Sequence, residues 1–285
     1  MPSSERRGSL LVLSSAAAYG AMPILARLAF ADGVGVAALL AYRFLFATLL
    51  FLLLRRRGGA ALPLRRRLVL WALGVLFLGN ALCYFLALER VPVSLLTLLV
   101  YTYPVLVTLL SAALGLEPLT LRNLAAAGLA FGGGALTAGS IASADPLGVA
   151  LALATAVIYA LYMVLATRLA RDAASEDAAL HVSQVALLAY GAWAGLRGEL
   201  VLHTTPRAWA ALAVIGAVCT VLALRGFLAG LALVGPARAS VLSSFELVVA
   251  VALAMLFLGE RPGSRVLIGG ALIVAAAALQ RPPLR

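Results

Sequence analysis

The sequence contains few charged residues: aspartate, glutamate, lysine and arginine together make up 12% of its 285 residues, whereas a soluble domain has about 25%. Hydrophobic residues make up 64%, and the mean hydropathy is +1.07. A soluble core of this length could not bury so much apolar surface, so the solvent of this chain must be lipid. The composition therefore excludes an ordinary soluble domain and predicts an all-α integral membrane protein.

Cysteine and histidine are also scarce. Cys83 and Cys219 each lie inside an apolar run and cannot form a disulfide framework. His181 and His203 are well separated, so we expect no metal site and no cofactor. The chain contains no G-x-S-x-G, no H-E-x-x-H and no aspartate-rich metal loop, which argues against an integral membrane enzyme and leaves no candidate catalytic residue.

Lysine is absent, and all 22 basic residues are arginines. The net charge of +11 could suggest a nucleic-acid partner, but the arginines do not form a stripe interleaved with aromatic residues. They lie in the gaps between apolar runs, which is the pattern that orients a protein in a membrane. We therefore expect membrane lipid, and no nucleic acid, as a partner.

Ten apolar runs are long enough to cross a bilayer as helices, because about twenty residues suffice. The breaks between them carry glycine, proline and charge, as in Gly259–Gly263. Arg6 and Arg7 precede the first run in the manner of a signal peptide, but membrane segments continue throughout, so we expect an uncleaved first helix. The expected spans are residues 9–29, 34–54, 67–88, 93–114, 121–139, 146–168, 179–197, 207–232, 238–258 and 264–280.

The positions of the arginines predict the orientation of these spans. With the N-terminus in the cytoplasm, 14 arginines lie on the cytoplasmic side and 6 on the other, while Arg43 and Arg225 fall within spans. Cytoplasmic loops carry an excess of basic residues. Both termini are therefore expected in the cytoplasm.

One stretch of the chain occurs twice. Val91–Leu129 aligns with Val234–Leu272 when the sequence is shifted by 143 positions. Eight aligned positions are identical, and one of them pairs Glu117 with Glu260. Identical apolar residues are weak signals in such a chain, but each glutamate also ends an apolar run at the same place. The sequence therefore predicts two copies of one unit, residues 1–142 and 143–285.

The number of spans in each copy predicts their relative orientation. Each copy holds five spans, an odd number, so the second copy must enter the membrane upside down relative to the first. Inverted repeats are common in secondary transporters, where the substrate lies near the membrane midplane between the halves. The architecture favours transport without proving it.

The chain resembles the EamA family of the drug/metabolite transporter superfamily. The resemblance covers nearly the whole chain, including Pro104 within the fourth span and Arg43 in the second, although Leu247 stands in the second copy where the first has Pro104. It implies export of amino acids or other small metabolites, and length and tyrosine content are most similar to the bacterial aromatic amino-acid exporters of the YddG type. The matching stretches are AAYGAMPILARLA, LVYTYPVLVTLLSAALGLEPLT, VIYALYMVLATRLA and VLSSFELVVAVALAMLFLGERPG.

A polar face runs along the fourth expected span, with residues spaced by 4, 3, 4 and 3 positions on one side of a helix. In lipid such a face needs a neighbouring helix or a water-filled cavity. For Thr108 and Ser111 we favour hydrogen bonds to a neighbouring helix. For Tyr101 and Tyr103 we favour a cavity, because Pro104 frees a backbone carbonyl and can act as a hinge. The face comprises Thr97, Tyr101, Pro104, Thr108 and Ser111.

Other spans carry tyrosines at similar depth, each offering an apolar ring with a hydrogen-bonding tip that suits a small amphipathic solute. An interfacial aromatic belt is the alternative, but Tyr84 and Tyr101 lie too deep in their spans for it. The resemblance implies that the first, third, fourth, sixth, eighth and ninth spans surround the cavity, which adds Ser243 and Ser244. Apart from charged residues, the predicted substrate-binding residues are Tyr19, Met22, Asn80, Tyr84, Tyr101, Tyr103, Tyr159, Tyr162, Ser243 and Ser244.

Three charged residues lie within spans, and each must face protein or water. Glu246 is a candidate for proton coupling or for binding a substrate amine; the alternative is a structural partner for an arginine or the backbone. Arg225 is a candidate receptor for a substrate carboxylate. Arg43, through the resemblance, is expected to be structural. Glu117 and Glu260 lie at helix ends, where a turn or cap role is expected.

Taken together, these patterns predict a secondary transporter that exports amino acids or related metabolites across the bacterial inner membrane by alternating access. A drug or nucleotide-sugar carrier is the alternative within the superfamily, and a channel or a membrane enzyme is the alternative outside it. Gly128 and Gly132 form a G-x-x-x-G pattern, for which packing within one monomer is favoured over a dimer contact.

Overall fold

The structure of the chain is a computed structural model, and every regular element among its described residues is a helix. The described residues are 3–54, 63–115, 120–121, 124–126, 128–129, 132–133, 136, 144–169, 175–200, 204–234, 242–243 and 245–279. The helices are α1 (Ser3–Ala31), α2 (Val36–Leu54), α3 (Leu64–Arg90), α4 (Val93–Val100), α5 (Tyr103–Ala113), α7 (Pro146–Leu169), α8 (Ser175–Leu196), α9 (Pro206–Gly216), η1 (Ala217–Leu222), α10 (Ala223–Val234), α12 (Phe245–Leu258) and α13 (Ser264–Leu279).

Several of these helices can cross a membrane. Five stretches are long and apolar enough by length and composition: Glu5–Ala31, Val36–Leu54, Leu68–Arg90, Ala179–Leu196 and Pro206–Gly230. Four shorter apolar helices coincide with further expected spans: Val93–Val107, Pro146–Tyr162, Phe245–Leu258 and Ser264–Ala276. The fifth expected span, 121–139, falls mostly outside the described residues. The multi-pass, all-helical fold is as expected, and the number of ten spans stays a prediction.

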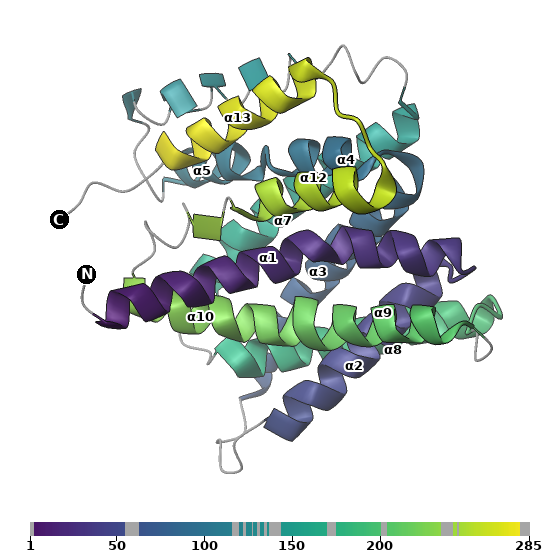
Figure 1. Cartoon of the computed structure of the whole chain (residues 1–285). Helices are drawn as coiled ribbons and strands as arrows, with labels where there is room; N and C mark the ends of the chain where they lie inside the picture. Colours follow the sequence, from purple (N-terminus) through teal and green to yellow (C-terminus); the bar gives the residue numbers. More distant parts are fainter. Residues whose placement is uncertain are drawn as a thin grey trace.

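Helices α1 and α10 run side by side, and α1 begins at the same end of the bundle at which α13 finishes (Figure 1). An even number of crossings would produce this arrangement. Which side of the membrane this end faces stays a prediction from the arginine count.

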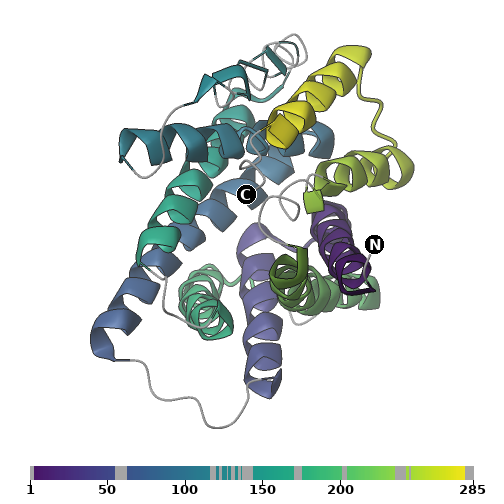
Figure 2. The same ribbon diagram turned by 90° about the vertical axis from the view of Figure 1, so that its left-hand side faces the viewer.

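The helices pack in pairs that join the first and second halves of the chain. Helix α3 packs along α7, and α10 packs along α1 (Figures 1 and 2). Helix α1 also contacts α12, while α7 contacts both α4 and α5. Helix α2 packs against α8. Nearly all of the extensive contacts therefore cross from one half of the chain to the other.

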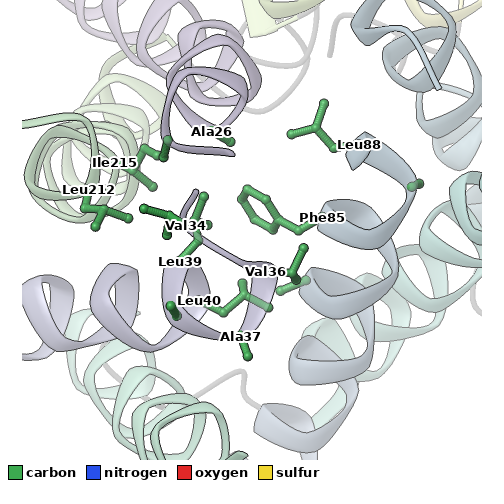
Figure 3. Packing of buried hydrophobic residues seen from close by; sticks show 14 of the residues in the cluster. Ala26, Val34, Val36, Ala37, Leu39, Leu40, Phe85, Leu88, Leu212 and Ile215 are labelled. Carbon is green, nitrogen blue, oxygen red and sulfur yellow. The ribbon is translucent and has the colours of Figure 1, made fainter. Parts of the chain in front are cut away.

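The main hydrophobic core lies toward the end of the bundle opposite the termini. Helix α1 finishes there, α2 begins there, and residues of α3 and α9 complete the core. Figure 3 shows side chains of this core from α1, the loop before α2, α2, α3 and α9: Ala26, Val34, Val36, Ala37, Leu39, Leu40, Phe85, Leu88, Leu212 and Ile215, all of which are buried. This core packs one end of the bundle tightly.

Polar contacts join the helix ends around the core. The Glu260 carboxylate accepts hydrogen bonds from the backbone N–H of Val93 at 2.6 Å, the backbone N–H of Ser94 at 3.0 Å and the Ser94 hydroxyl at 2.7 Å. These donors lie in the first turn of α4, whose unpaired N–H groups and macrodipole favour an anion. Glu260 thus caps a helix of the other half of the chain. We call this contact the Glu260 clasp.

Three further contacts join neighbouring loops at this end. The Arg27 side chain donates to the Val91 carbonyl, and the Thr205 hydroxyl donates to the Asp32 carboxylate at 2.6 Å. Arg90 lies 3.1 Å from Asp145, and its hydrogen bond holds the pKa of the Asp145 carboxyl below its usual range. The helix ends are therefore tied together around the whole rim of the core.

The Glu260 clasp predicts a stability loss when its charge is removed. Glu260→Gln weakens the charge-assisted hydrogen bonds to α4, and we expect it to lower the free energy of unfolding by about 1–2 kcal/mol. Thermal unfolding of the purified protein in detergent, followed by tryptophan fluorescence, measures this change. The exposed neighbour Arg261 provides the control variant Arg261→Gln. Equal unfolding temperatures for the two variants would contradict the clasp.

Candidate substrate site

A break in the fourth span positions two tyrosines. Helix α4 ends at Val100 and α5 begins at Tyr103, with Tyr101 and Thr102 forming a turn between them. Pro104 lies in the first turn of α5, where a residue without a backbone N–H fits, and it cannot donate to the carbonyl four residues earlier. The fourth span therefore consists of two helices. The break between them lies at Tyr101 and Tyr103, the two tyrosines that the sequence predicts to face a cavity.

The Tyr101 hydroxyl lies between two acceptors. It is 3.1 Å from the Glu246 Oε2 atom and 3.1 Å from the Ser243 carbonyl oxygen. Glu246 lies in the first turn of α12, where the helix dipole favours a negative charge. Among the described residues, no arginine forms an ion pair with Glu246. The carboxylate is thus held by a hydroxyl and a helix end, without a counter-ion.

A row of tyrosine rings leads away from Tyr101. Tyr101 and Tyr103 meet edge to face with ring centroids 5.9 Å apart, and Tyr103 meets Tyr159 of α7 in the same way at 4.7 Å. Tyr159 and Tyr162 are stacked at 6.2 Å. Such contacts stabilise neighbouring rings beyond their burial. We call Tyr101, Tyr103, Tyr159 and Tyr162 the tyrosine row.

Tyr19 on α1 and Tyr84 on α3 complete the surroundings of Glu246. Both are half-buried, and both are near enough to Glu246 and to Arg43 to feel the two charges. Helices α1, α3, α4, α5, α7 and α12 all contribute side chains to this region.

Gly20 brings α1 against the backbone of α12 at Glu246. A Cβ atom at this position would lie 2.7 Å from the Glu246 carbonyl oxygen and 3.0 Å from the Val249 Cβ atom. The first distance is shorter than a Cβ atom tolerates and the second is tight, so glycine is needed for this approach. The residue next to Tyr19 thus fixes where α12 begins.

Arg43 is buried on α2 at the other side of the site, with 5% of its surface exposed. Its Nε–H donates to the Thr220 hydroxyl at 3.1 Å, and its guanidinium lies 5.1 Å from the ring centre of Phe44 and 5.5 Å from that of Phe85. Aromatic faces attract a cation but do not neutralise it. No carboxylate of the described residues forms an ion pair with Arg43.

The structure places three predicted residues in other surroundings. The Asn80 side chain donates to the Thr155 carbonyl at 3.0 Å and so links α3 to α7. Met22 packs against the main hydrophobic core. Arg225 is half-buried on α10, next to Gly226, which faces Leu11 and Ser15 of α1.

The remaining predicted positions are only partly visible. Ser243 takes part through its backbone carbonyl, which the Tyr101 hydroxyl contacts. Ser244 lies outside the described residues, as do the side chains of Thr108 and Ser111.

Sequence reasoning missed Thr220 and the segment that carries it. The segment η1 is a π-helix between α9 and α10, and no glycine or proline inside it signals the irregularity. Gly216, which precedes η1, is the one available hint: a Cβ atom there would lie 2.5 Å from the Phe46 Cβ and 2.8 Å from the Arg43 carbonyl oxygen. Among the described residues, no group of three or more metal-ligating side chains lies together.

Comparisons with known proteins agree with this fold. Residues 6–139 and 146–280 each match the model of the EamA-like transporter family. A solved crystal structure, described only as that of a protein, has a TM-score of 0.69 with this chain at 22% sequence identity. The match covers 95% of this chain and 97% of that one, and shows a shared fold. No curated protein matches the chain.

The close approach at Gly20 predicts a strong effect of one added methyl group. Gly20→Ala pushes α12 away from α1, and we expect it to lower the free energy of unfolding by about 1–3 kcal/mol, as overpacking does. Gly191→Ala is the matched control, because a Cβ atom on α8 at that position meets nothing within 4 Å. Thermal unfolding of both variants in detergent measures the difference. The assigned contact is wrong if Gly20→Ala is as stable as the control.

Proposed function

This chain belongs to the EamA-like transporter family, and from that premise we propose that it exports amino acids or related small metabolites across the bacterial inner membrane. The observation that carries the proposal is a carboxylate, Glu246, held by the Tyr101 hydroxyl and surrounded by tyrosines in the interior of a helical bundle. Charged groups inside membrane proteins are costly and mark pathways for ions and substrates.

Two inverted halves would give the protein its alternating access. The family model matches the chain twice, once in each proposed half, 1–142 and 143–285. The helix packing supports the same division. Each span of the first half has a counterpart five spans later in the second half. When every span is swapped with its counterpart, the main helix–helix contacts turn into one another. Helix α3 against α7 becomes α10 against α1, and α1 against α12 becomes α7 against α4 and α5. In such folds the two halves rock about a central site.

The tightly packed end of the bundle supports a state closed on one side. The hydrophobic core and the Glu260 clasp both lie at the end opposite the termini. With the termini in the cytoplasm, this end faces outward, and the structure corresponds to a carrier closed toward the outside. Opening that end would require the clasp between α4 and Glu260 to separate.

Glu246 can exchange a proton without losing its hydrogen bond. When the carboxylate is ionised, the Tyr101 hydroxyl donates to it. When it is protonated, the carboxyl donates to the Tyr101 oxygen, and Tyr101 donates to the Ser243 carbonyl. Both protonation states are therefore satisfied by the same atoms. A proton and a substrate ammonium group would compete for this carboxylate, which couples their movements in opposite directions.

The tyrosine row also suits a second class of substrate. Edge-to-face and stacked rings beside a carboxylate can bind a planar aromatic cation, as expected for a drug carrier. Buried charges of both signs near Tyr19 and Tyr84 favour an amino acid instead, because it carries both an ammonium and a carboxylate group.

Transport by the purified protein in liposomes tests this proposal. We expect saturable, counterflow-competent uptake of at least one amino acid from a panel, stimulated by an outwardly directed proton gradient. Glu246→Gln is expected to abolish the stimulation, since a glutamine side chain cannot carry the proton. Tyr42→Phe, on the core-facing side of α2, is the control for general damage.

Three results would contradict parts of the proposal. Failure of every amino acid to be carried or to compete, with uptake of ethidium or a nucleotide sugar, would replace the amino-acid assignment. Flux that does not saturate would indicate a channel. Proton-stimulated transport that survives in Glu246→Gln would remove the proton role from this residue.

A further inference from the structure

Arg43 is a buried charge without a visible counter-ion. It lies on α2 with 5% of its surface exposed, and no carboxylate of the described residues pairs with it. Removing a guanidinium from water is expensive unless an anion or several hydrogen bonds compensate. The groups that interact with Arg43 electrostatically include Tyr19, Tyr84 and Tyr190, which supply dipoles but no full negative charge.

The surroundings of Arg43 hold it in one orientation. The Thr220 hydroxyl donates its only proton to the Ile215 carbonyl at 2.8 Å, so its oxygen lone pairs face the Arg43 Nε–H. The rings of Phe44 and Phe85 flank the guanidinium. A guanidinium fixed through Nε can bind a carboxylate end-on through its two terminal nitrogens, in the parallel geometry that arginine favours.

The π-helical segment η1 places Thr220 for this contact. It interrupts the eighth span between α9 and α10 at the level of Arg43, and Gly216 lets its backbone approach that of α2. π-Helical turns are rare and are found often at functional sites. The irregular turn thus packs against α2 and places the Thr220 hydroxyl beside the Arg43 side chain.

Arg43 and Glu246 form the two poles of the site. Helix α1 connects them: Gly20, next to Tyr19, lies against the backbone of Glu246, and α1 also packs against η1, which carries Thr220. We propose that Arg43, positioned by Thr220, binds the carboxylate group of the transported amino acid while Glu246 binds its ammonium group. This inference rests on the proposed function and assigns a new role to Arg43. Arg225, which the sequence favoured for the carboxylate, is the competing assignment.

Competition with carboxyl-blocked substrates tests the assignment. The transported substrate is the amino acid of the panel that the wild type carries best. The unlabelled amino acid and its carboxamide (phenylalaninamide, where the amino acid is phenylalanine) are compared as competitors of its uptake into liposomes that contain each variant. With the wild-type protein, we expect the apparent affinity of the acid to be at least about tenfold higher than that of the amide. One charge-assisted contact accounts for a difference of this size. In Arg43→Gln this preference is expected to disappear through weaker binding of the acid, while the affinity for the amide stays unchanged.

A second variant separates positioning from folding. Thr220→Val removes the hydroxyl that holds Nε with little change in shape, and we expect it to reduce the acid-over-amide preference several-fold. Thr48→Val is the matched control on α2, because the buried Thr48 hydroxyl has no hydrogen-bond partner and its removal should leave the preference intact.

The outcomes distinguish this inference from the proposed function. Transport of no amino acid by the wild type overturns both. Arg43→Gln and Thr220→Val could still transport the amino acid while binding the acid and the amide more weakly by the same factor. This result shows a structural role for Arg43 and leaves the proposed function standing. Loss of the acid preference in Arg225→Gln, with the preference kept in Arg43→Gln, moves the carboxylate site to Arg225.

Discussion

The structure depends on one constraint: in a bilayer, every buried polar group must find its partner within the protein or its substrate. Most polar side chains of the described spans meet this requirement with a helix neighbour, as Ser15 does with the Ala223 carbonyl and Asn80 with the Thr155 carbonyl. Glu246 and Arg43 do not meet it as fully. Each has hydrogen bonds to hydroxyl groups, and neither has an opposite charge within the described part of the chain. Among the described residues the Arg27 Nε and Thr48 Oγ1 atoms also lack hydrogen-bond partners, but Glu246 and Arg43 are the charges at the proposed site.

Both charges coincide with departures from regular helix. The carboxylate lies opposite the turn at Tyr101 and Thr102, where the fourth span is broken. The guanidinium lies opposite the π-helical segment Ala217–Leu222. An unbroken α-helix directs its backbone groups to itself, whereas a break offers carbonyls and hydroxyls to other groups. Glycines 20 and 216 bring the backbones close at the same two places. Close backbone packing thus accompanies both charges.

The sequence was informative where the physics is local or periodic. Hydropathy predicted the spans that the structure describes, and proline predicted the position of the break in the fourth span. The repeat singled out Glu260, which the structure shows capping α4. Residue spacing could not reveal which polar groups meet across helices, such as the Asn80 side chain and the Thr155 carbonyl. The π-helix had no signal, because its hydrogen-bond register depends on packing against α2.

The proposed inverted halves and the proposed site have different symmetries, and this difference matters for a carrier of amino acids. Alternating access is simplest when the two halves are interchangeable, so that the closed end and the open end exchange roles at similar free energy. A site for a zwitterion must instead be polar, with one charge at each pole. Two of the differences between the proposed halves lie at the proposed site. Glu246 occupies the place of Tyr103 in the other copy, and Leu247 occupies that of Pro104. Because these substitutions lie at the middle of the ninth and fourth spans, the helix ends that open and close can remain equivalent. In the proposed mechanism, a bound substrate would keep its orientation while the halves exchange conformations around it.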